Sequence, residues 1–257
     1  MSERGPRGTV TPCDPVTTES EERHVADTGT TPSASDRPED NLTPGEFVDS
    51  DAPEVREFAE RAVGGEDDEV RRAGLLFGAV RDRIWYDPFR ISTDPRDYRA
   101  SVVAVAPRNW CVPKAVLLTA SARAVGIPAR LGFADVRNHL NTPRLRALMN
   151  GHDVFIHHGY SELYLGGRWL KASPAFNAEL CHRFGVEPLD FDGEGHTLMH
   201  QFTGDGARYM EYVVDHGPSA DLPLDTILTR FRATYGEALL GGDSHAGTDE
   251  FSAPTSA

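Results

Sequence analysis

A helix-forming segment that begins at a cysteine constrains this chain more than any other feature. The residues from Cys111 to Val125 are mostly apolar or small. Apolar residues recur along one flank at spacings of three and four, at Val112, Val116, Leu117, Ala120 and Ala124. Pro113 suits the first helical turn, where its missing N–H costs nothing, while Gly126 and Pro128 end the helix. The pattern predicts a buried helix with Cys111 at its start.

The position of Cys111 at a helix start has a chemical consequence. The positive end of the helix macrodipole and the free backbone N–H groups of the first turn favour thiolate over thiol. A thiolate that acts as a nucleophile needs a base, and the base needs a group that orients it. Both must come from elsewhere in the chain.

Charge and cysteine content exclude several classes of partner. The formal net charge of −14 at pH 7 argues against nucleic acid or an anionic membrane surface as a partner. Residues 1–10 lack the apolar segment of a signal peptide, and no stretch approaches the ~18 apolar residues of a membrane span. Cys13, Cys111 and Cys181 are far apart and odd in number, so they do not indicate a disulfide framework. These features predict a cytoplasmic protein and leave its oligomeric state open.

Composition divides the chain into one folded domain and two tails. Residues 1–40 and 237–257 are rich in small polar and acidic residues and contain few large apolar ones. Such segments cannot bury enough apolar surface to offset the entropy lost on ordering. We therefore predict disordered tails on either side of a domain formed by residues 41–236.

Hydrophobic periodicity predicts helices first and strands afterwards. Helical spacing marks residues 53–63, 67–84 and 224–235, in addition to the cysteine helix. A period of two predicts strands at residues 129–136, 154–158, 160–165, 168–173 and 208–214. The predicted fold class is α+β, with N-terminal helices, one of which begins at the cysteine, packed on a mostly antiparallel sheet.

A predicted hairpin supplies the base. Gly166-Gly167 forms a two-residue turn between strands, and this register places Tyr160 opposite Ser173. His158 is then the diagonal neighbour of Ser173 on the same face of the sheet, where a polar group can orient its imidazole. His157 is the alternative base, but in a regular strand it faces the other side.

Two segments resemble the transglutaminase-like superfamily. The run NWCVPKA…RAVGIPAR at residues 109–130 is similar to its nucleophile segment, and HGYSELYLGGRW at residues 158–169 is similar to its histidine hairpin. The resemblance implies a papain-like fold with a Cys, His, Asp triad that hydrolyses amides or transfers acyl groups through a thioester. It makes Cys111 the nucleophile and His158 the base.

The third triad position departs from the family pattern. Members usually carry Asp-Pro after the hairpin tryptophan, whereas this chain has Ser173-Pro174. A serine can accept a hydrogen bond from the imidazole but brings no charge to stabilise imidazolium, and losing a triad carboxylate can lower the rate by orders of magnitude. Asn177, Asp190 and Asp192 are alternative groups that could orient His158.

Two further sets of residues need an interpretation. Trp110 and Asn109 precede the nucleophile and are candidate oxyanion donors alongside the Cys111 N–H, although Trp110 could equally be a core aromatic. His196 and His200 stand four apart, downstream of Cys181-His182, which is a spacing that can hold zinc. No glutamate follows His196 as a metalloprotease helix requires. We expect neither a metal nor a cofactor.

Two functions therefore remain open. The first is a thiol enzyme whose Cys111 attacks a peptide, amide or thioester substrate and forms an acyl-enzyme, which water or an amine then resolves. The second is a catalytically weak or inactive member of the family that serves as a binding module. The serine at position 173 supports the second function. Cys111 and His158 support the first, because a binding role needs neither.

Overall fold

The computed structural model describes residues 34–139, 141–199, 206, 208–241 and 251. The N-terminal elements are η1 (Pro38–Leu42), α1 (Pro53–Val63), α2 (Glu69–Arg83), β1 (Trp85–Tyr86), η2 (Pro95–Tyr98), α3 (Ala100–Val103) and β2 (Arg108–Asn109). They are followed by α4 (Cys111–Ala124), β3 (Ala129–Asn138), α5 (Pro143–Leu148), β4 (Val154–Leu165), β5 (Arg168–Ala172), α6 (Ala178–Arg183), β6 (Met210–Ser219) and α7 (Leu224–Tyr235). Most of both predicted tails lies outside the described residues.

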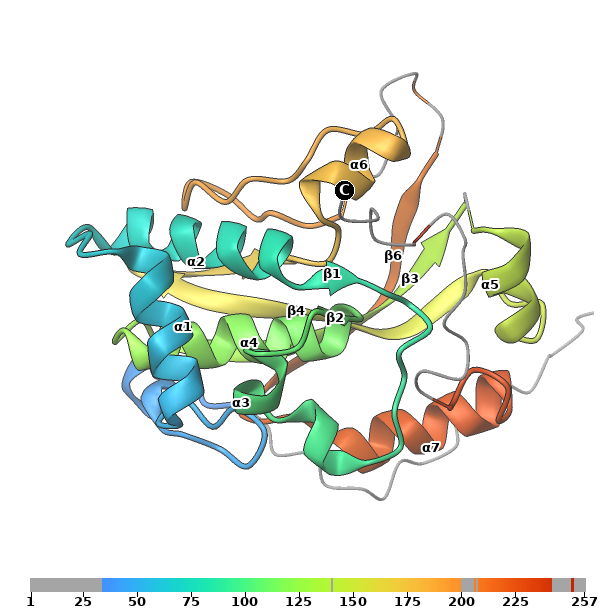
Figure 1. The fold of residues 1–257 in the computed structure, drawn as a ribbon, viewed down its shortest axis with the longest axis horizontal. Coiled ribbons are helices and arrows are strands. Elements are labelled where there is room, and N and C mark those ends of the chain that lie inside the picture. Colours follow the sequence, from blue (N-terminus) through green and yellow to red (C-terminus); the bar gives the residue numbers. More distant parts are fainter. Residues whose placement is uncertain (1–33, 140, 200–205, 207, 242–250, 252–257) are drawn as a thin grey trace, which may run out of the picture. The chain divides into compact units, whose positions relative to one another are not determined.

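An antiparallel sheet forms the centre of the described domain. Its strand order is β5-β4-β3-β6, and all three pairings are antiparallel. A separate parallel pair joins β1 to β2, just before the cysteine helix. Helices α1, α2 and α3 pack against α4, which itself packs against β3 and β4 (Figure 1). This arrangement confirms the predicted α+β class.

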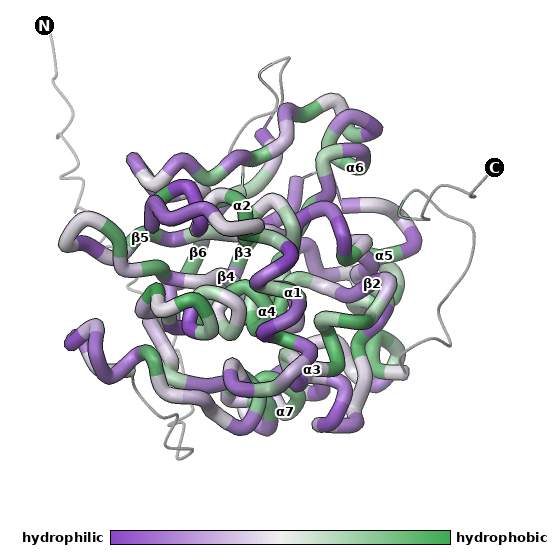
Figure 2. Tube along the Cα trace, turned by 60° about the vertical axis from the view of Figure 1, so that its left-hand side comes forward, coloured by the Kyte–Doolittle hydropathy of each residue, from purple (hydrophilic) through white to green (hydrophobic). Residues whose placement is uncertain are grey.

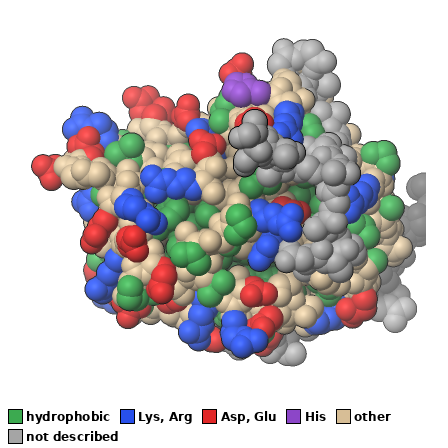
Figure 3. Space-filling view, in the orientation of Figure 1, with side chains coloured by type: hydrophobic (Ala, Val, Ile, Leu, Met, Phe, Trp, Pro, Cys, Tyr) green, Lys and Arg blue, Asp and Glu red, His purple; other side chains and the backbone are tan. Residues whose placement is uncertain are grey.

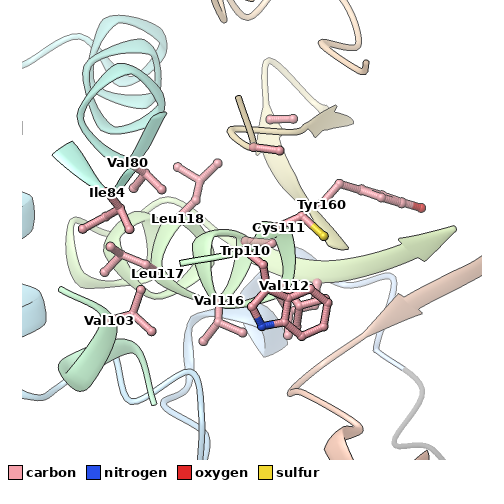
Figure 4. Packing of buried hydrophobic residues seen from close by; sticks show 14 of the residues in the cluster. Val80, Ile84, Val103, Trp110, Cys111, Val112, Val116, Leu117, Leu118 and Tyr160 are labelled. Atoms are coloured by element: carbon pink, nitrogen blue, oxygen red, sulfur yellow. The ribbon is translucent and has the colours of Figure 1, made fainter. Parts of the chain in front are cut away.

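Helix α4 is buried on every side. All residues from Cys111 to Arg123 are buried, so the apolar flank predicted from the spacing is only part of the buried surface. Figure 4 shows the reason: Val80, Ile84 and Val103 of neighbouring segments approach the helix from the side away from the sheet. Hydrophobic residues gather along α4 and the strands beside it, while peripheral segments are mostly hydrophilic (Figure 2). A helix enclosed in this way holds Cys111 rigidly.

The predicted hairpin is confirmed residue by residue. Leu165 pairs with Arg168 and Tyr164 with Trp169, on either side of the Gly166-Gly167 turn. Both glycines have positive φ, 56° and 83°, which a two-residue turn of this kind requires. The expected register of β4 against β5 follows from that turn.

Strand β4 runs unbroken through Gly159, where two separate strands were predicted. The glycine permits a close approach to α4, because a Cβ there would lie 2.9 Å from Val112 Cα. The sequence pattern suggested a break, since glycine weakens strands. Tight packing against the helix is the reason for the glycine.

Other elements differ from the predicted ones. The short helices α5 and α6 were not predicted, and β6 begins and ends later than expected. On one face of the molecule, acidic and basic side chains are interspersed (Figure 3), and Arg81, for example, pairs with both Asp82 and Asp190. None of the helices among the described residues has the length and apolar character that crossing a bilayer requires.

Candidate active site

Cys111 is the first residue of α4 and follows an extended N-cap residue, Trp110. Burial raises the pKa of its thiol to about 11, although hydrogen bonds from the backbone N–H groups of Gly159, Val112 and Cys111 itself lower it. The thiolate expected from the helix position is therefore not the resting form. A helix terminus contributes at most about 2 kcal/mol, whereas complete burial can shift a pKa by about 3–5 units.

His158 lies in β4, directly before the Gly159 N–H that contacts the Cys111 sulfur. Its Nε2 is 3.0 Å from the Oγ of Ser173, which is the contact that the hairpin register predicts. Burial lowers the pKa of His158 to about 4. Burial thus favours the neutral forms of both the thiol and the imidazole.

Ser173 is fixed by its backbone as well as by its side chain. It follows the end of β5, and its N–H donates to the carbonyl of Thr197 at 2.9 Å. Ala172 forms an isolated bridge with the same threonine. The backbone on either side of this position is therefore fixed, and it holds the Ser173 hydroxyl beside His158. In the tautomer with the proton on Nε2, the imidazole donates to Ser173 and Nδ1 is the basic nitrogen.

The three alternative orienting groups have other hydrogen-bond partners in the structure. Asn177 caps α6: its Oδ1 accepts from the N–H of Tyr86 at 2.7 Å, and its Nδ2 donates to the carbonyls of Arg81 and Ile84. Asp190 pairs with Arg81, and Asp192 accepts from the N–H of Glu194. The Asn177 amide thus makes its hydrogen bonds with the backbone at the end of α2 and at Tyr86.

Trp110 and Asn109, the two candidate oxyanion donors, make contacts around the start of α4. The Trp110 ring packs against Phe231, 5.6 Å between centroids, and against Tyr98. In Figure 4 its indole and the Cys111 sulfur point to different sides of α4. The Asn109 side chain accepts a hydrogen bond from the Trp110 N–H at 3.1 Å. Trp110 is a core aromatic, and both residues position the start of the helix.

Lys114 is a buried residue near the site that the sequence analysis missed. It lies one turn after Cys111, and its Nζ donates to the carbonyls of Arg81 at 2.9 Å and Ile84 at 2.6 Å. Burial lowers its pKa to about 7. A lysine in the first turn of a mostly apolar helix is the signal that could have indicated this role, because a buried charge needs acceptors inside the fold.

A small cavity lies beside His158, and a second one shares part of its lining. One, of about 20 Å³, is lined by His158 together with Tyr86, Phe155, Phe176 and Phe251. A second, of about 50 Å³, shares Phe176 and Phe251 with the first. The Phe251 carbonyl accepts a hydrogen bond from the Trp85 indole at 2.6 Å. The surroundings of the base are thus aromatic and closely packed.

Of the residues considered for zinc, His196, Cys181 and His182 lie in the described part of the chain. The His196 Nδ1 accepts a hydrogen bond from the Lys171 N–H at 3.0 Å. Cys181 and His182 lie in α6, and His200 is outside the described residues. His157, the alternative base, has its Nδ1 4.0 Å from the Asp135 carboxylate.

Comparison with known proteins agrees with this geometry. Residues 56–174, which include Cys111, His158 and Ser173, match the model of the transglutaminase-like superfamily. A proposed cysteine protease from Cytophaga hutchinsonii is 20% identical with a TM-score of 0.39, and the match covers 52% of this chain and 40% of that one. A proposed protease from Parabacteroides distasonis is 13% identical with a TM-score of 0.30, and the match covers 64% of this chain and 31% of that one.

The chain therefore spans less than half the length of each of these two proteins. A comparison with curated proteins finds no match. The segment matched by the family model contains the cysteine helix, the histidine strand and the hairpin that were recognised in the sequence. The segment formed by residues 56–174 is therefore similar to the transglutaminase-like superfamily.

Proposed function

We propose that this chain is a thiol-dependent amide hydrolase or acyltransferase in which Cys111 is the nucleophile and His158 the base. One observation carries the proposal. Strand β4, which holds His158, packs directly on the start of α4, where a Cβ at Gly159 would lie 2.9 Å from the Cα of Val112, the residue after Cys111. Ser173 holds the same imidazole at 3.0 Å.

The reaction follows the chemistry of a thiol nucleophile. The Cys111 proton moves to His158, and the sulfur forms a bond to the substrate carbonyl carbon. The resulting oxyanion is stabilised by backbone N–H groups at the start of α4, Cys111 and Val112 being next to the sulfur. The C–N or C–S bond then breaks, and the leaving group takes the proton from His158. Water or an amine attacks the thioester and releases the acyl group.

The substrate is proposed to be a peptide, amide or thioester. The largely apolar lining around His158 would keep water away from the reacting carbonyl. The net charge of −14 disfavours nucleic acid and anionic membranes as partners. The widely spaced cysteines support a reducing compartment such as the cytoplasm.

The second candidate is a binding module with little or no activity. Its support is the serine at the third triad position, together with the burial of Cys111, which is only 6% exposed. The two candidates differ in one observable property, because only an enzyme forms an acyl-thioester at Cys111 in the folded chain.

The test is acylation of the native chain with p-nitrophenyl acetate, followed by an acid quench and peptide mass spectrometry. We expect one acetyl group on Cys111, present also in Cys181→Ala and absent in Cys111→Ala. Adding hydroxylamine after the acyl-enzyme forms would show whether an amine competes with water. Acetylation of Cys181 alone, or none at all, would favour the binding module.

A further inference from the structure

Asp135 lies in β3 where the pairing is irregular on both sides, with one register shift toward β4 and two toward β6. On the β4 side, Ala134 pairs with His158 and Val136 with Phe155, so β4 holds an extra residue opposite Asp135. On the β6 side, Phe133 pairs with Gly217 and Ala134 with Asp215, which leaves His216 as an extra residue. Bulges re-aim side chains and are often found next to functional sites.

Both bulges carry a histidine toward Asp135. His157 has a φ of 52°, an uncommon conformation for a residue other than glycine. The Nε2 of His216 is 2.7 Å from Asp135 Oδ1, and the Nδ1 of His157 is 4.0 Å from the same oxygen. The two imidazole rings stack with their centroids 4.4 Å apart. Three side chains from three adjacent strands therefore converge on one point.

The donor atoms match those of a transition-metal site. One carboxylate oxygen and two imidazole nitrogens lie within 4.8 Å of one another, and this is a set that zinc accepts. Three protein ligands leave a coordination position for water. His216 is the most exposed of the three, with 21% of its side chain accessible, and it lies in an edge strand. An ion could therefore enter from the solvent side of β6.

We propose that Asp135, His157 and His216 bind one divalent transition-metal ion of the zinc class. Ligand atoms about 2.0–2.2 Å from a tetrahedral ion are separated from one another by about 3.3 Å. On binding, the 2.7 Å distance between Asp135 and His216 would increase and the 4.0 Å distance between Asp135 and His157 would decrease. Rotation of the side chains supplies both changes. The proton on the His216 nitrogen moves to the other ring nitrogen or is released on binding. The site is separate from the acyl-transfer chemistry and does not depend on it.

The ion would have a structural consequence near the candidate active site. His157 directly precedes His158 in β4, and its bulge sets where that strand resumes its regular pairing with Ala134. A ligand bond at His157 would therefore hold the bulge in one conformation. The alternative is a cluster joined only by hydrogen bonds, in which Asp135 accepts from His216 and from the His157 backbone N–H.

Calorimetric titration with Zn²⁺ tests the proposal. The full chain, free of any histidine tag and stripped of metal by a chelator, should bind one ion and unfold at a higher temperature with the ion bound. Loss of a ligand in His216→Ala should weaken binding at least about tenfold. His139→Ala is the matched control, because His139 contacts a single carboxylate, Glu211, at 3.2 Å. Its affinity for Zn²⁺ should be unchanged.

A spectroscopic measurement on the unmodified chain supplements the variants. Co²⁺ in place of Zn²⁺ should give visible absorption bands of a site with nitrogen and oxygen ligands, without the charge-transfer bands of a thiolate. Asp135→Asn, which keeps the size of the side chain, should abolish these bands. The proposal is overturned if the wild-type chain does not bind Zn²⁺, if thiolate bands appear, or if folded His216→Ala and Asp135→Asn bind as tightly as the wild type.

Discussion

The Nζ of Lys114 and the Nδ2 of Asn177 donate hydrogen bonds to the same two backbone carbonyls, those of Arg81 and Ile84. The lysine distances are 2.9 and 2.6 Å, and the asparagine distances are 2.5 and 3.1 Å. These carbonyls lie at the end of α2. The C-terminal end of α2 thereby connects the first turn of α4, which begins at Cys111, to the start of α6. The chain uses buried polar groups to fix the position of its nucleophile.

Replacing Lys114 with methionine should destabilise the fold. The change removes two hydrogen bonds to buried carbonyls, of which each unsatisfied group costs about 1–3 kcal/mol, and Asn177 still satisfies part of the loss. We expect the free energy of unfolding to fall by about 1–3 kcal/mol, measured by urea denaturation. Lys171→Met is the control, because Lys171 is partly exposed and pairs with Asp215. An equal loss in both variants would contradict the role of the buried terminus.

Alkylation of Cys111 by iodoacetamide should be slow at neutral pH. Because burial raises the pKa of the thiol to about 11, little thiolate is present there. The rate should then rise about tenfold per pH unit between about pH 7 and 10, since the thiolate is the reactive form. Mass spectrometry of quenched samples gives the rate, and the urea-unfolded chain provides the comparison. A rate that levels off below pH 8 would instead indicate a thiolate already formed in the closed site.

Replacing Ser173 with aspartate should increase acylation of Cys111. A carboxylate 3.0 Å from the His158 imidazole, in place of the present hydroxyl, stabilises the imidazolium that forms when the thiol loses its proton. We expect a rise of at least about tenfold in the rate of acetylation by p-nitrophenyl acetate. The melting temperature should fall, because position 173 is only 1% exposed and the new charge is buried.

Ser173→Ala provides the matched comparison. Removing a neutral hydrogen-bond partner should cost only about 0.5–1.5 kcal/mol of stability and change acylation little. His158→Ala should abolish the difference between aspartate and serine at position 173. Equal rates in all of these variants would show that His158 plays no part in activating Cys111.

Replacing Gly159 with alanine should separate the histidine strand from the cysteine helix. The added Cβ would lie 2.9 Å from Val112 Cα and 3.1 Å from its Cγ2, closer than packed atoms tolerate. We expect a loss of about 1–3 kcal/mol in unfolding free energy and slower acylation of Cys111. Gly78→Ala in α2 is the control, since a Cβ added at Gly78 would have no neighbouring atom within 4 Å. Unchanged acylation in a folded Gly159→Ala would contradict the proposed contact.

Local sequence patterns determined several elements of the fold. The boundaries of α1 and α7, the start of α4 at Cys111 and the register of the hairpin agree with the structure. Each depends on interactions a few residues apart, namely helical spacing, capping residues and a two-residue turn. The contact between His158 and Ser173 follows from the same turn, because pairing in a sheet repeats regularly.

Only the tertiary structure decided the chemical state of the site and its surroundings. The pKa of Cys111 depends on burial inside the fold, and this effect exceeds that of the helix terminus. The Asn177 amide donates hydrogen bonds to carbonyls about 90 residues earlier in the chain. The bulges that bring His157 and His216 to Asp135 arise where three strands pair. Desolvation and convergence of this kind depend on residues far apart in sequence, so no local pattern encodes them.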